Sequence, residues 1–589
     1  MSNGFAFPLD FGAEPVSPGR TRFRLWAPAQ QAVSVVLEGR PPVPMAPDGD
    51  GWFAAEAPCG PGALYRFRLE DGLEVPDPAS RFQPQDVFGP SMVVDPRAYR
   101  WRHPGWTGRP WREAVIYELH AGACGGFAGV AAMLPRLAEL GVTVVELMPV
   151  NDFPGSRNWG YDGVLPFAPD AAYGTPDELK ALVDTAHGLG LMMMLDVVYN
   201  HFGPDGNFLG HYAPQFFHGD GTTAWGQALD FERPAVRRFF TENALYWLME
   251  YRFDGLRFDA VQAIGEPGWL DETAAAVRAA TEPGRHVHLV LEHDENEASH
   301  LQAGFDAQWN DDAHHVLHTM LTGEREGYYS DYADDPARRL ARCLAEGFAY
   351  QGEASAYRDG RPRGTPSAGL PPTAFVLFLQ NHDQIGNRAF GDRLTTLAPP
   401  AALEAAIALQ LLAPQIPLLF MGEEDASPTP FLFFTDHRPP LDEAVREGRR
   451  REFARFPAFA DPERRSRIPD PNAEATFRDS IPRPDPGHGA ARRALYTRLL
   501  ALRRDEIAPR LDHARSLGAA AVGERAVRAR WRMGDGAVLT LLANLGPEAV
   551  GVERPAGRAL FAQTPEAEAG LGSGRLDGFT TAAFLEPAG

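Results

Sequence analysis

The sequence predicts an α/β protein, built as a closed (β/α)8 TIM barrel with an N-terminal β-sandwich domain and a small C-terminal β domain. Eight apolar strand patterns alternate with amphipathic helix patterns between about residues 110 and 505. Short alternating strands precede that region, and similar strands return after it. The chain has 589 residues, too many for one hydrophobic core, although a barrel takes about 250 residues as one domain.

The first 97 residues are expected to form the β-sandwich domain. Apolar and polar residues alternate over 21–26, 32–37 and 64–69. Glycine and aspartate pairs at 48–51 and 71–72 mark the turns between strands. We find no catalytic group in this part of the chain.

Residues 98–507 are assigned to the barrel, and residues 508–589 to a C-terminal β-sandwich. The expected barrel strands are 115–119, 142–149, 191–198, 255–261, 287–292, 305–310, 373–379 and 416–421. Helices are expected over 129–140, from Thr175, and over 234–251, 267–280, 312–321, 401–412 and 488–504. Two long loops, about 201–225 and 323–371, interrupt the pattern. Loops of that length are usually functional or mobile, and we expect the second to leave the barrel.

The composition excludes several classes of partner. The net charge of −22 argues against nucleic-acid binding and against an anionic membrane surface, and it fits a soluble protein with a neutral substrate. The three cysteines have no C-x-x-C spacing, so we expect neither a disulfide framework nor a zinc site. No secretory signal pattern and no bilayer-spanning apolar run is present, so a cytoplasmic location is expected.

A charged pair in the fourth strand is the strongest local signal. Arg257 and Asp259 lie on one face of a strand that is otherwise apolar. Charged residues are rarely buried unless they are paired, so the arginine is expected to keep the carboxylate ionised. A structural ion pair at a strand end is an equally good interpretation of this pair alone.

Further polar residues end other predicted strands, and a barrel carries its active site at that edge. The third strand ends with Asp196, Asn200 and His201, the fifth with Glu292, and the seventh with His382 and Asp383. Acidic groups therefore converge from four strands, which a structural ion-pair network would seldom need.

Glycoside cleavage requires two carboxyl groups around the scissile bond, with one of them protonated. Asp259 has Arg257 nearby and is expected to be ionised. Glu292 follows an apolar run with no cationic neighbour except His293, so it is the best candidate for the acid. A metal site formed by His201, Asp196 and Asp259 is the less favoured alternative, because no metal-binding histidine spacing occurs.

These stretches resemble the four sequence regions of the α-amylase superfamily, glycoside hydrolase family 13. The matching stretches are 196–201, 255–259, Glu292 and 381–383, in the order and spacing of that family. Other stretches, 158–163, 379–394, 419–424 and 431–437, are similar to its trehalose-releasing hydrolases. Those enzymes hydrolyse the α-1,4 bond next to the terminal trehalose of maltooligosyltrehalose, and the resemblance also implies an enzyme that forms this substrate as a working partner.

The resemblance implies a role for each residue. Asp259 would be the nucleophile, Glu292 the acid and base, and Asp383 the group that stabilises the transition state. Retention of configuration implies that the carboxyl groups of Asp259 and Glu292 lie roughly 5–5.5 Å apart. Arg257 would orient the nucleophile. The remaining substrate-binding candidates are Tyr161, Asp196, Asn200, His201 and His382.

The trehalose end and the metal content are less well defined. Glu423 and Phe434 are candidates for recognising that end, together with Glu424, Phe431, Asp436 and His437. Any one of them is equally well explained as shaping the loop after strand eight. The loop after strand three has no acidic ligand cluster, so no calcium, and no cofactor, is expected.

Three alternatives remain open at this point. A glucan branching enzyme would share the barrel, but its fourth region tends to read Ser-His-Asp-Glu, whereas this chain has 381–384 as Asn-His-Asp-Gln. A debranching enzyme would carry Glu-Pro after strand five, where Glu292 and His293 stand. A non-catalytic glucan-binding protein would have lost a carboxylate, and none is missing here.

Overall fold

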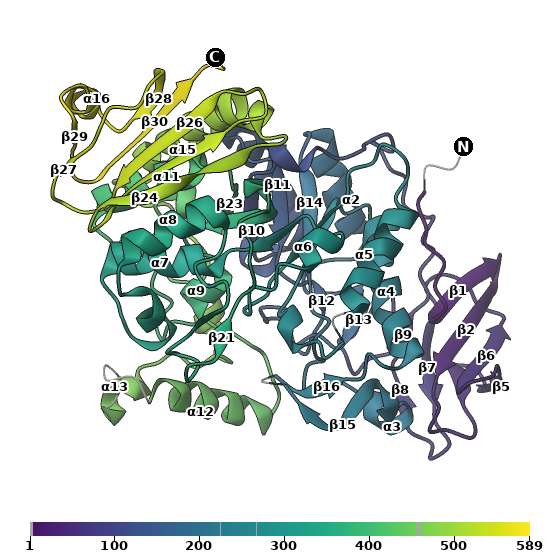
Figure 1. The fold of residues 1–589 in the computed structure, drawn as a ribbon. Coiled ribbons are helices and arrows are strands. Elements are labelled where there is room, and N and C mark those ends of the chain that lie inside the picture. Colours follow the sequence, from purple (N-terminus) through teal and green to yellow (C-terminus); the bar gives the residue numbers. More distant parts are fainter. Residues whose placement is uncertain (1–3, 224, 267, 455–458, 460, 589) are drawn as a thin grey trace.

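Eight parallel strands close into a barrel at the centre of the molecule (Figure 1). The computed structural model describes residues 4–223, 225–266, 268–454, 459 and 461–588, so predicted limits at Met1, Pro267 and Gly589 lie outside the described residues. The barrel strands are, in order, β10 (Ile116–Leu119), β11 (Val144–Leu147), β14 (Met192–Val197), β17 (Gly255–Phe258), β18 (His288–Leu291), β19 (Ala307–Trp309), β22 (Phe375–Phe378) and β23 (Ile416–Phe420). All eight fall within the predicted ranges, and the predicted fold class is confirmed.

Burial on both faces explains why these strands are almost continuously apolar. All six residues of β14 are buried, as expected for a parallel strand covered by helices outside and filled by side chains inside. The interior is packed by a distinct apolar cluster that includes Ile116, Met194 and Trp309. The barrel is therefore closed below the site and open only at its carboxyl-terminal edge.

Helices surround the barrel and begin where the sequence predicts. They include α1 (Gly126–Leu140), α2 (Pro176–Gly188), α4 (Pro234–Met249), α5 (Gly268–Ala280), α7 (Asp311–Thr322), α11 (Pro400–Leu412) and α15 (Gly489–Leu502). The start of α2 is a capping box, in which the Thr175 hydroxyl accepts from the Glu178 amide and the Glu178 carboxylate accepts from the Thr175 amide.

The N-terminal strands form two facing sheets on one flank of the barrel, purple in Figure 1. One sheet contains β1 (Gly12–Ser17), β2 (Arg20–Trp26), β6 (Trp52–Ala57) and β5 (Ala46–Pro47). The other contains β4 (Val43–Pro44), β3 (Ser34–Leu37), β7 (Leu64–Arg68), β8 (Glu74–Val75) and β9 (Ser91–Met92). Phe11 packs edge-on against Phe239 of α4, with ring centroids 5.1 Å apart, so this domain is anchored to the barrel.

The C-terminal domain packs on the opposite flank, yellow in Figure 1. Its main sheet has the order β24 (Arg515–Gly523), β25 (Ala526–Arg532), β26 (Val538–Asn544), β30 (Thr580–Glu586) and β28 (Arg558–Ala562). A second pair, β27 (Val550–Gly551) and β29 (Arg575–Leu576), lies beside α16 (Pro565–Gly572). The Trp531 indole donates to the Leu344 carbonyl at 3.2 Å, which ties the sheet to the barrel. The predicted domain limits near 97 and 507 fall between elements and remain predictions.

Both predicted long loops contain secondary structure. The first holds α3 (Leu209–Tyr212), β15 (Phe217–Thr222) and β16 (Gln227–Leu229). The second holds a 3-10 helix (Gly327–Tyr332), α8 (Pro336–Glu346), β20 (Glu353–Ala354) and β21 (Pro362–Arg363). Two excursions were not predicted: β12 (Asn151–Asp152) with β13 (Leu165–Pro169), and the helices α12 (Leu441–Phe453), α13 (Pro462–Ser466) and α14 (Glu474–Arg478) after β23. α12 buries only Phe453, so its sequence carries little periodic apolar signal.

Candidate active site

A cavity of about 1770 Å³ lies at the carboxyl-terminal edge of the barrel. Its walls come from the loops after β12, β14, β17, β18 and β23 and from the region around Asp383. The cavity contains Asp259, Glu292 and Asp383, so the structure brings the three predicted carboxylates to one place. Tyr161, His201 and His382 line it as well.

Arg257 organises the floor of this cavity. Its Nη1 donates to Asp196 Oδ2 at 2.5 Å and to Asp259 Oδ1 at 2.9 Å, and its Nη2 donates to Glu292 Oε2 at 2.6 Å. The guanidinium carbon lies 4.2 Å from the ring centre of Trp309, so the barrel interior supports it from below. A planar fork of this kind suits several carboxylates at once, which a lysine could not do.

The Arg257 contacts correct one part of the sequence argument. Glu292 was expected to lack a cationic neighbour, but Arg257 reaches it from the adjacent strand. Strand-end residues that are distant in sequence meet across a parallel sheet, so a search along the chain cannot find this partner. Arg257 is thus shared by Asp259 and Glu292 and is not reserved for Asp259.

Two further donors, one from a side chain and one from the backbone, hold these carboxyl groups. Asn200 Nδ2 donates to Asp259 Oδ2 at 2.8 Å, which completes the hold that Arg257 begins. Ala260 N donates to Glu292 Oε2 at 2.9 Å. Ala260 has φ 41°, in the left-handed region that alanine rarely adopts, and such strain is typical of functional sites.

The pKa of Glu292 lies well above its usual value. Burial is the largest cause; Arg257 lowers the pKa in part, while the charges of Asp259 and Asp383 raise it again. Together these causes favour the protonated form of Glu292, although the guanidinium of Arg257 opposes it. Asp383 is more open, with its side chain 35% exposed, and Asn387 Nδ2 donates to its Oδ1 at 3.0 Å.

His382 and Tyr161 form a second polar layer beside these groups. The Tyr161 hydroxyl lies 2.6 Å from Asp196 Oδ2 and 2.8 Å from His382 Nε2. The two rings stack with centroids 5.1 Å apart. His382 Nδ1 is in turn bonded to Glu118, a residue that the sequence argument did not consider.

His201 follows Asn200 in the chain and also lines the cavity. Its Nδ1 lies 2.5 Å from Asn200 Oδ1, and its ring stacks on Trp225 at 5.9 Å between centroids. Burial lowers the pKa of His201 and so favours its neutral ring, while the charges of Asp259 and Asp162 raise the pKa in part. Trp225 is 51% exposed, which is unusual for a tryptophan and leaves one wall of the cavity aromatic.

Five predicted substrate-binding residues do not line the cavity, and one of them is the fully buried Arg257. Asp196 and Asn200 are buried behind Arg257 and Asp259, so they position other side chains. Glu423 lies in a buried turn, where its carboxylate accepts from the Phe420 amide and the Tyr496 hydroxyl, each at 3.0 Å. Phe434 is fully buried in an aromatic cluster. The chain turns inward after β23, and sequence position alone gave no sign of this.

The structure adds cavity residues that the sequence argument missed. The segment Gly323–Tyr329 and the side chains of Val445, Arg449 and Phe453 form a large share of the wall. Arg449 of α12 donates to the carbonyls of Gly386 at 2.6 Å and Arg388 at 3.1 Å, and so supports the segment that carries Asp383. The sequence signal that could have drawn attention to α12 is its arginine-rich stretch at 446–451. Of the other candidates after strand eight, His437 lines the cavity.

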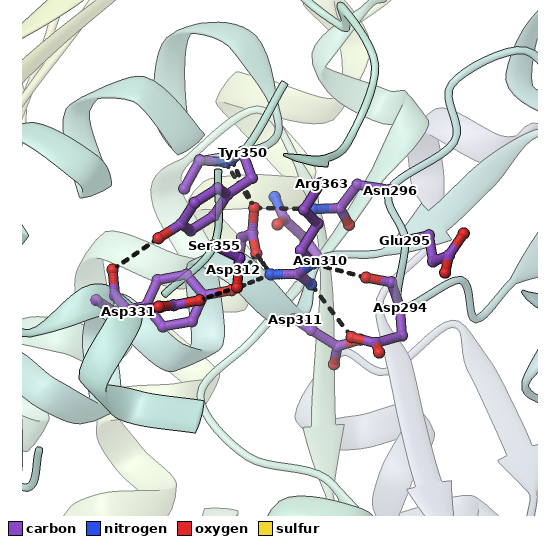
Figure 2. Close-up of polar contacts among 12 residues, drawn as sticks. Asp294, Glu295, Asn296, Asn310, Asp311, Asp312, Asp331, Tyr350, Ser355 and Arg363 are labelled. Carbon is purple, nitrogen blue, oxygen red and sulfur yellow. Dashed lines mark hydrogen bonds and ion pairs between the residues drawn. The ribbon is translucent and has the colours of Figure 1, made fainter. Parts of the chain in front are cut away.

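One wall is held by a buried arginine. Figure 2 shows Arg363 between Asp294 and Asp312. Its Nη1 donates to Asp312 Oδ1 at 2.7 Å, and its Nε donates to the Asp294 carbonyl at 2.7 Å. Asp331 accepts from the amide of Tyr357 at 2.9 Å, and the Tyr357 side chain lines the cavity. These bonds fasten the β20–β21 hairpin to the rim of the barrel.

Neither a metal-binding cluster nor a membrane-spanning helix is found among the described residues. Within the described ranges, no three His, Cys, Asp or Glu side chains are grouped so that they could hold a metal ion. In the same part of the chain, every helix is too short or too polar to cross a bilayer.

Comparison with known proteins places these features in a family. The model of the α-amylase catalytic domain matches residues 116–216, and a domain of unknown function, DUF3459, matches residues 514–582. A malto-oligosyltrehalose trehalohydrolase of Deinococcus radiodurans is 43% identical over 510 residues, which cover 84% of this chain and 83% of the relative. A putative alpha amylase from Salmonella typhimurium has a crystal structure that superposes with a TM-score of 0.92, at 46% identity over 98% of this chain and 100% of that one. A 1,4-alpha-glucan branching enzyme of Photobacterium profundum is 36% identical, but over 44% of this chain and 40% of its own length.

Proposed function

The chain belongs to the malto-oligosyltrehalose trehalohydrolase family of α-amylase-type glycosidases, and on that premise we propose that its cavity hydrolyses the α-1,4 bond beside a terminal trehalose. The products would be trehalose and a maltooligosaccharide. The observation that carries the proposal is the shared guanidinium of Arg257, which holds Asp259 and Glu292 around one point of the cavity.

The proposed reaction is a double displacement. Asp259 attacks the anomeric carbon while Glu292 gives its proton to the leaving oxygen, which thereby becomes a hydroxyl group of the departing trehalose. Glu292 then removes a proton from water, which attacks the glucosyl-enzyme ester and frees Asp259. Asp383 stabilises the positive charge that develops on the sugar ring. The raised pKa of Glu292 supports its assignment as the acid, because a group that protonates the leaving oxygen must hold a proton near neutral pH.

The surrounding residues have supporting roles in this proposal. Arg257 and Asn200 orient Asp259, and Asp196 acts through Arg257 and Tyr161. Tyr161 faces the sugar ring, and His201 and His382 are expected to bond its hydroxyls. No cofactor takes part. An enzyme that builds the terminal trehalose would supply the substrate, and the cytoplasmic location stays a prediction.

The deciding experiment compares two substrates of equal length. Maltotriosyltrehalose should yield free trehalose and maltotriose, while maltopentaose should change little over the same time. Equal cleavage of both would identify an ordinary amylase. Longer or branched products would identify a branching enzyme, and no reaction with either would leave a glucan-binding protein.

A further inference from the structure

Glu118 of β10 is a buried charged residue to which the proposed reaction gives no role. Its side chain is 1% exposed, in the interior of the barrel. One carboxylate oxygen is bonded to His382 Nδ1, and the other accepts from the His382 backbone amide at 3.2 Å. The first barrel strand thus holds both the ring and the backbone of a residue that follows the seventh strand.

The bonds at the other nitrogen of His382 define its protonation. Asp196 Oδ2 already accepts from Arg257 Nη1, and it lies 2.6 Å from the Tyr161 hydroxyl. A proton on Asp196 would have to sit on Oδ1, which has no hydrogen-bond partner within the described ranges. Tyr161 therefore donates its single proton to Asp196 and must accept from His382 Nε2. With Nδ1 donating to Glu118, both ring nitrogens carry a proton.

Electrostatics agree with this arrangement. Burial opposes a charge on His382, but Glu118 and Asp383 more than offset it and raise its pKa, while Arg257 lowers it in part. The ionisable groups that face His382 or its bonding partners come from several elements: Glu118 and His120 of β10 and its end, Glu146 of β11, Asp196 of β14, Arg257 of β17, Tyr161 after β12, and Asp383 beside it.

We propose that Glu118 is a positioning residue of the hydrolase, which fixes the His382 ring and keeps it as an imidazolium facing the bond to be cleaved. This inference rests on the proposed function, because it concerns the same site. His382 Nε2 lies 3.6 Å from Asp383 Oδ1, so the imidazolium and that carboxylate stand side by side in the cavity. Its charged Nε2–H donates to the Tyr161 hydroxyl, which makes a stronger bond than a neutral donor would and holds the Tyr161 ring at the cavity wall.

The chain supplies a matched control one strand away. Glu146 of β11 is the register partner of Glu118 and is equally buried. Burial, together with Glu118 and Asp196, raises its pKa well above the usual value, which favours its neutral form. Within the described residues, neither of its carboxyl oxygens has a hydrogen-bond partner. Glu146→Gln therefore removes no charge and no bond, whereas Glu118→Gln removes the charge that pairs with His382.

The test is the pH profile of kcat/KM for maltotriosyltrehalose, with thermal unfolding to show that each variant is folded. In Glu118→Gln, burial dominates and the folded pKa of His382 falls, so the imidazolium is lost at lower pH. We expect a loss on the order of 10- to 100-fold at pH 7, with the alkaline limb shifted down by about one pH unit or more and partial recovery near pH 5. Glu146→Gln should overlay the wild type.

A second background separates position from charge. In His382→Gln, adding Glu118→Gln should change kcat/KM by less than about threefold and shift no limb, because the two residues act as one unit. An equal loss at every pH, no loss at all, or the same loss in both backgrounds would overturn the proposal. Trehalose release by the wild type is scored separately. If it is absent, the proposed function fails; if it is present while the Glu118→Gln profile is unshifted, only the role of Glu118 fails.

Discussion

Replacing Asp196 by asparagine should make the protein more tolerant of high pH. Asp196 is buried and raised from an ordinary pKa of 3.8 to about 7, first by burial and then by Asp259, with Arg257 acting against the rise. A carboxyl group whose folded pKa is raised contributes stability below its unfolded pKa, and that stability is lost as pH rises to the folded pKa. At about 1.4 kcal/mol per pKa unit, the wild type loses about 4 kcal/mol between pH 4 and pH 7 through this group.

Asparagine has the same shape and keeps an oxygen for Tyr161 and Arg257, but it cannot ionise. The difference in Tm between Asp196→Asn and the wild type should therefore grow more favourable from pH 5 to pH 8. With roughly 1–2 °C per kcal/mol for a large domain, the expected gain is several degrees. Differential scanning calorimetry at four pH values measures it. A difference that stays flat or declines as pH rises would refute the reasoning.

Asp254 supplies a control of opposite sign on the neighbouring strand. It is fully buried and accepts from the Trp106 indole at 2.8 Å and the Met193 amide at 2.9 Å. Burial alone would raise its pKa, but these bonds and His187 lower it overall. The contribution of ionised Asp254 to the free energy of unfolding is therefore present above the unfolded pKa and is lost as pH falls through the folded pKa. Asp254→Asn should therefore become more destabilising, relative to the wild type, as pH rises.

Two further predictions follow from the contacts of the site. Asp259→Asn and Glu292→Gln should each lower kcat by several orders of magnitude with Tm preserved, and near-normal turnover in either variant would contradict the assigned roles. A crystal structure of the free enzyme should place the carboxyl groups of Asp259 and Glu292 roughly 5–5.5 Å apart, and a separation above roughly 6.5 Å would contradict retention of configuration. Arg363→Met should cost about 3–5 kcal/mol of unfolding free energy, because it strands the buried carboxylate of Asp312. Scanning calorimetry tests that loss, and an unchanged Tm would show that Asp312 is satisfied by its other donors.

The three carboxylates proposed as catalytic could be found in the sequence because apolar periodicity locates the strands and these carboxylates lie at strand ends. An apolar run that ends in an acid identifies a strand end, and the barrel brings all such ends to one edge. Asp259, Glu292 and Asp383 therefore meet where they were expected. The same reasoning could not find the sharing of Arg257 with Glu292, because lateral neighbours on parallel strands are separated by a whole helix in sequence.

Loop geometry was beyond the sequence for a different physical reason. Glu423 and Phe434 were expected at the cavity, yet the turn after β23 buries both, because Tyr496 and the Phe420 amide satisfy the carboxylate. α12 supplies cavity side chains from a mostly polar stretch, whose apolar residues are too few to predict which face of the helix is buried. The barrel, its order of strands and its reacting carboxylates follow from local patterns of burial. The hydrogen bonds that set protonation, such as the bond between Glu118 and His382, form only when the barrel closes and brings its first strand near the end of its seventh.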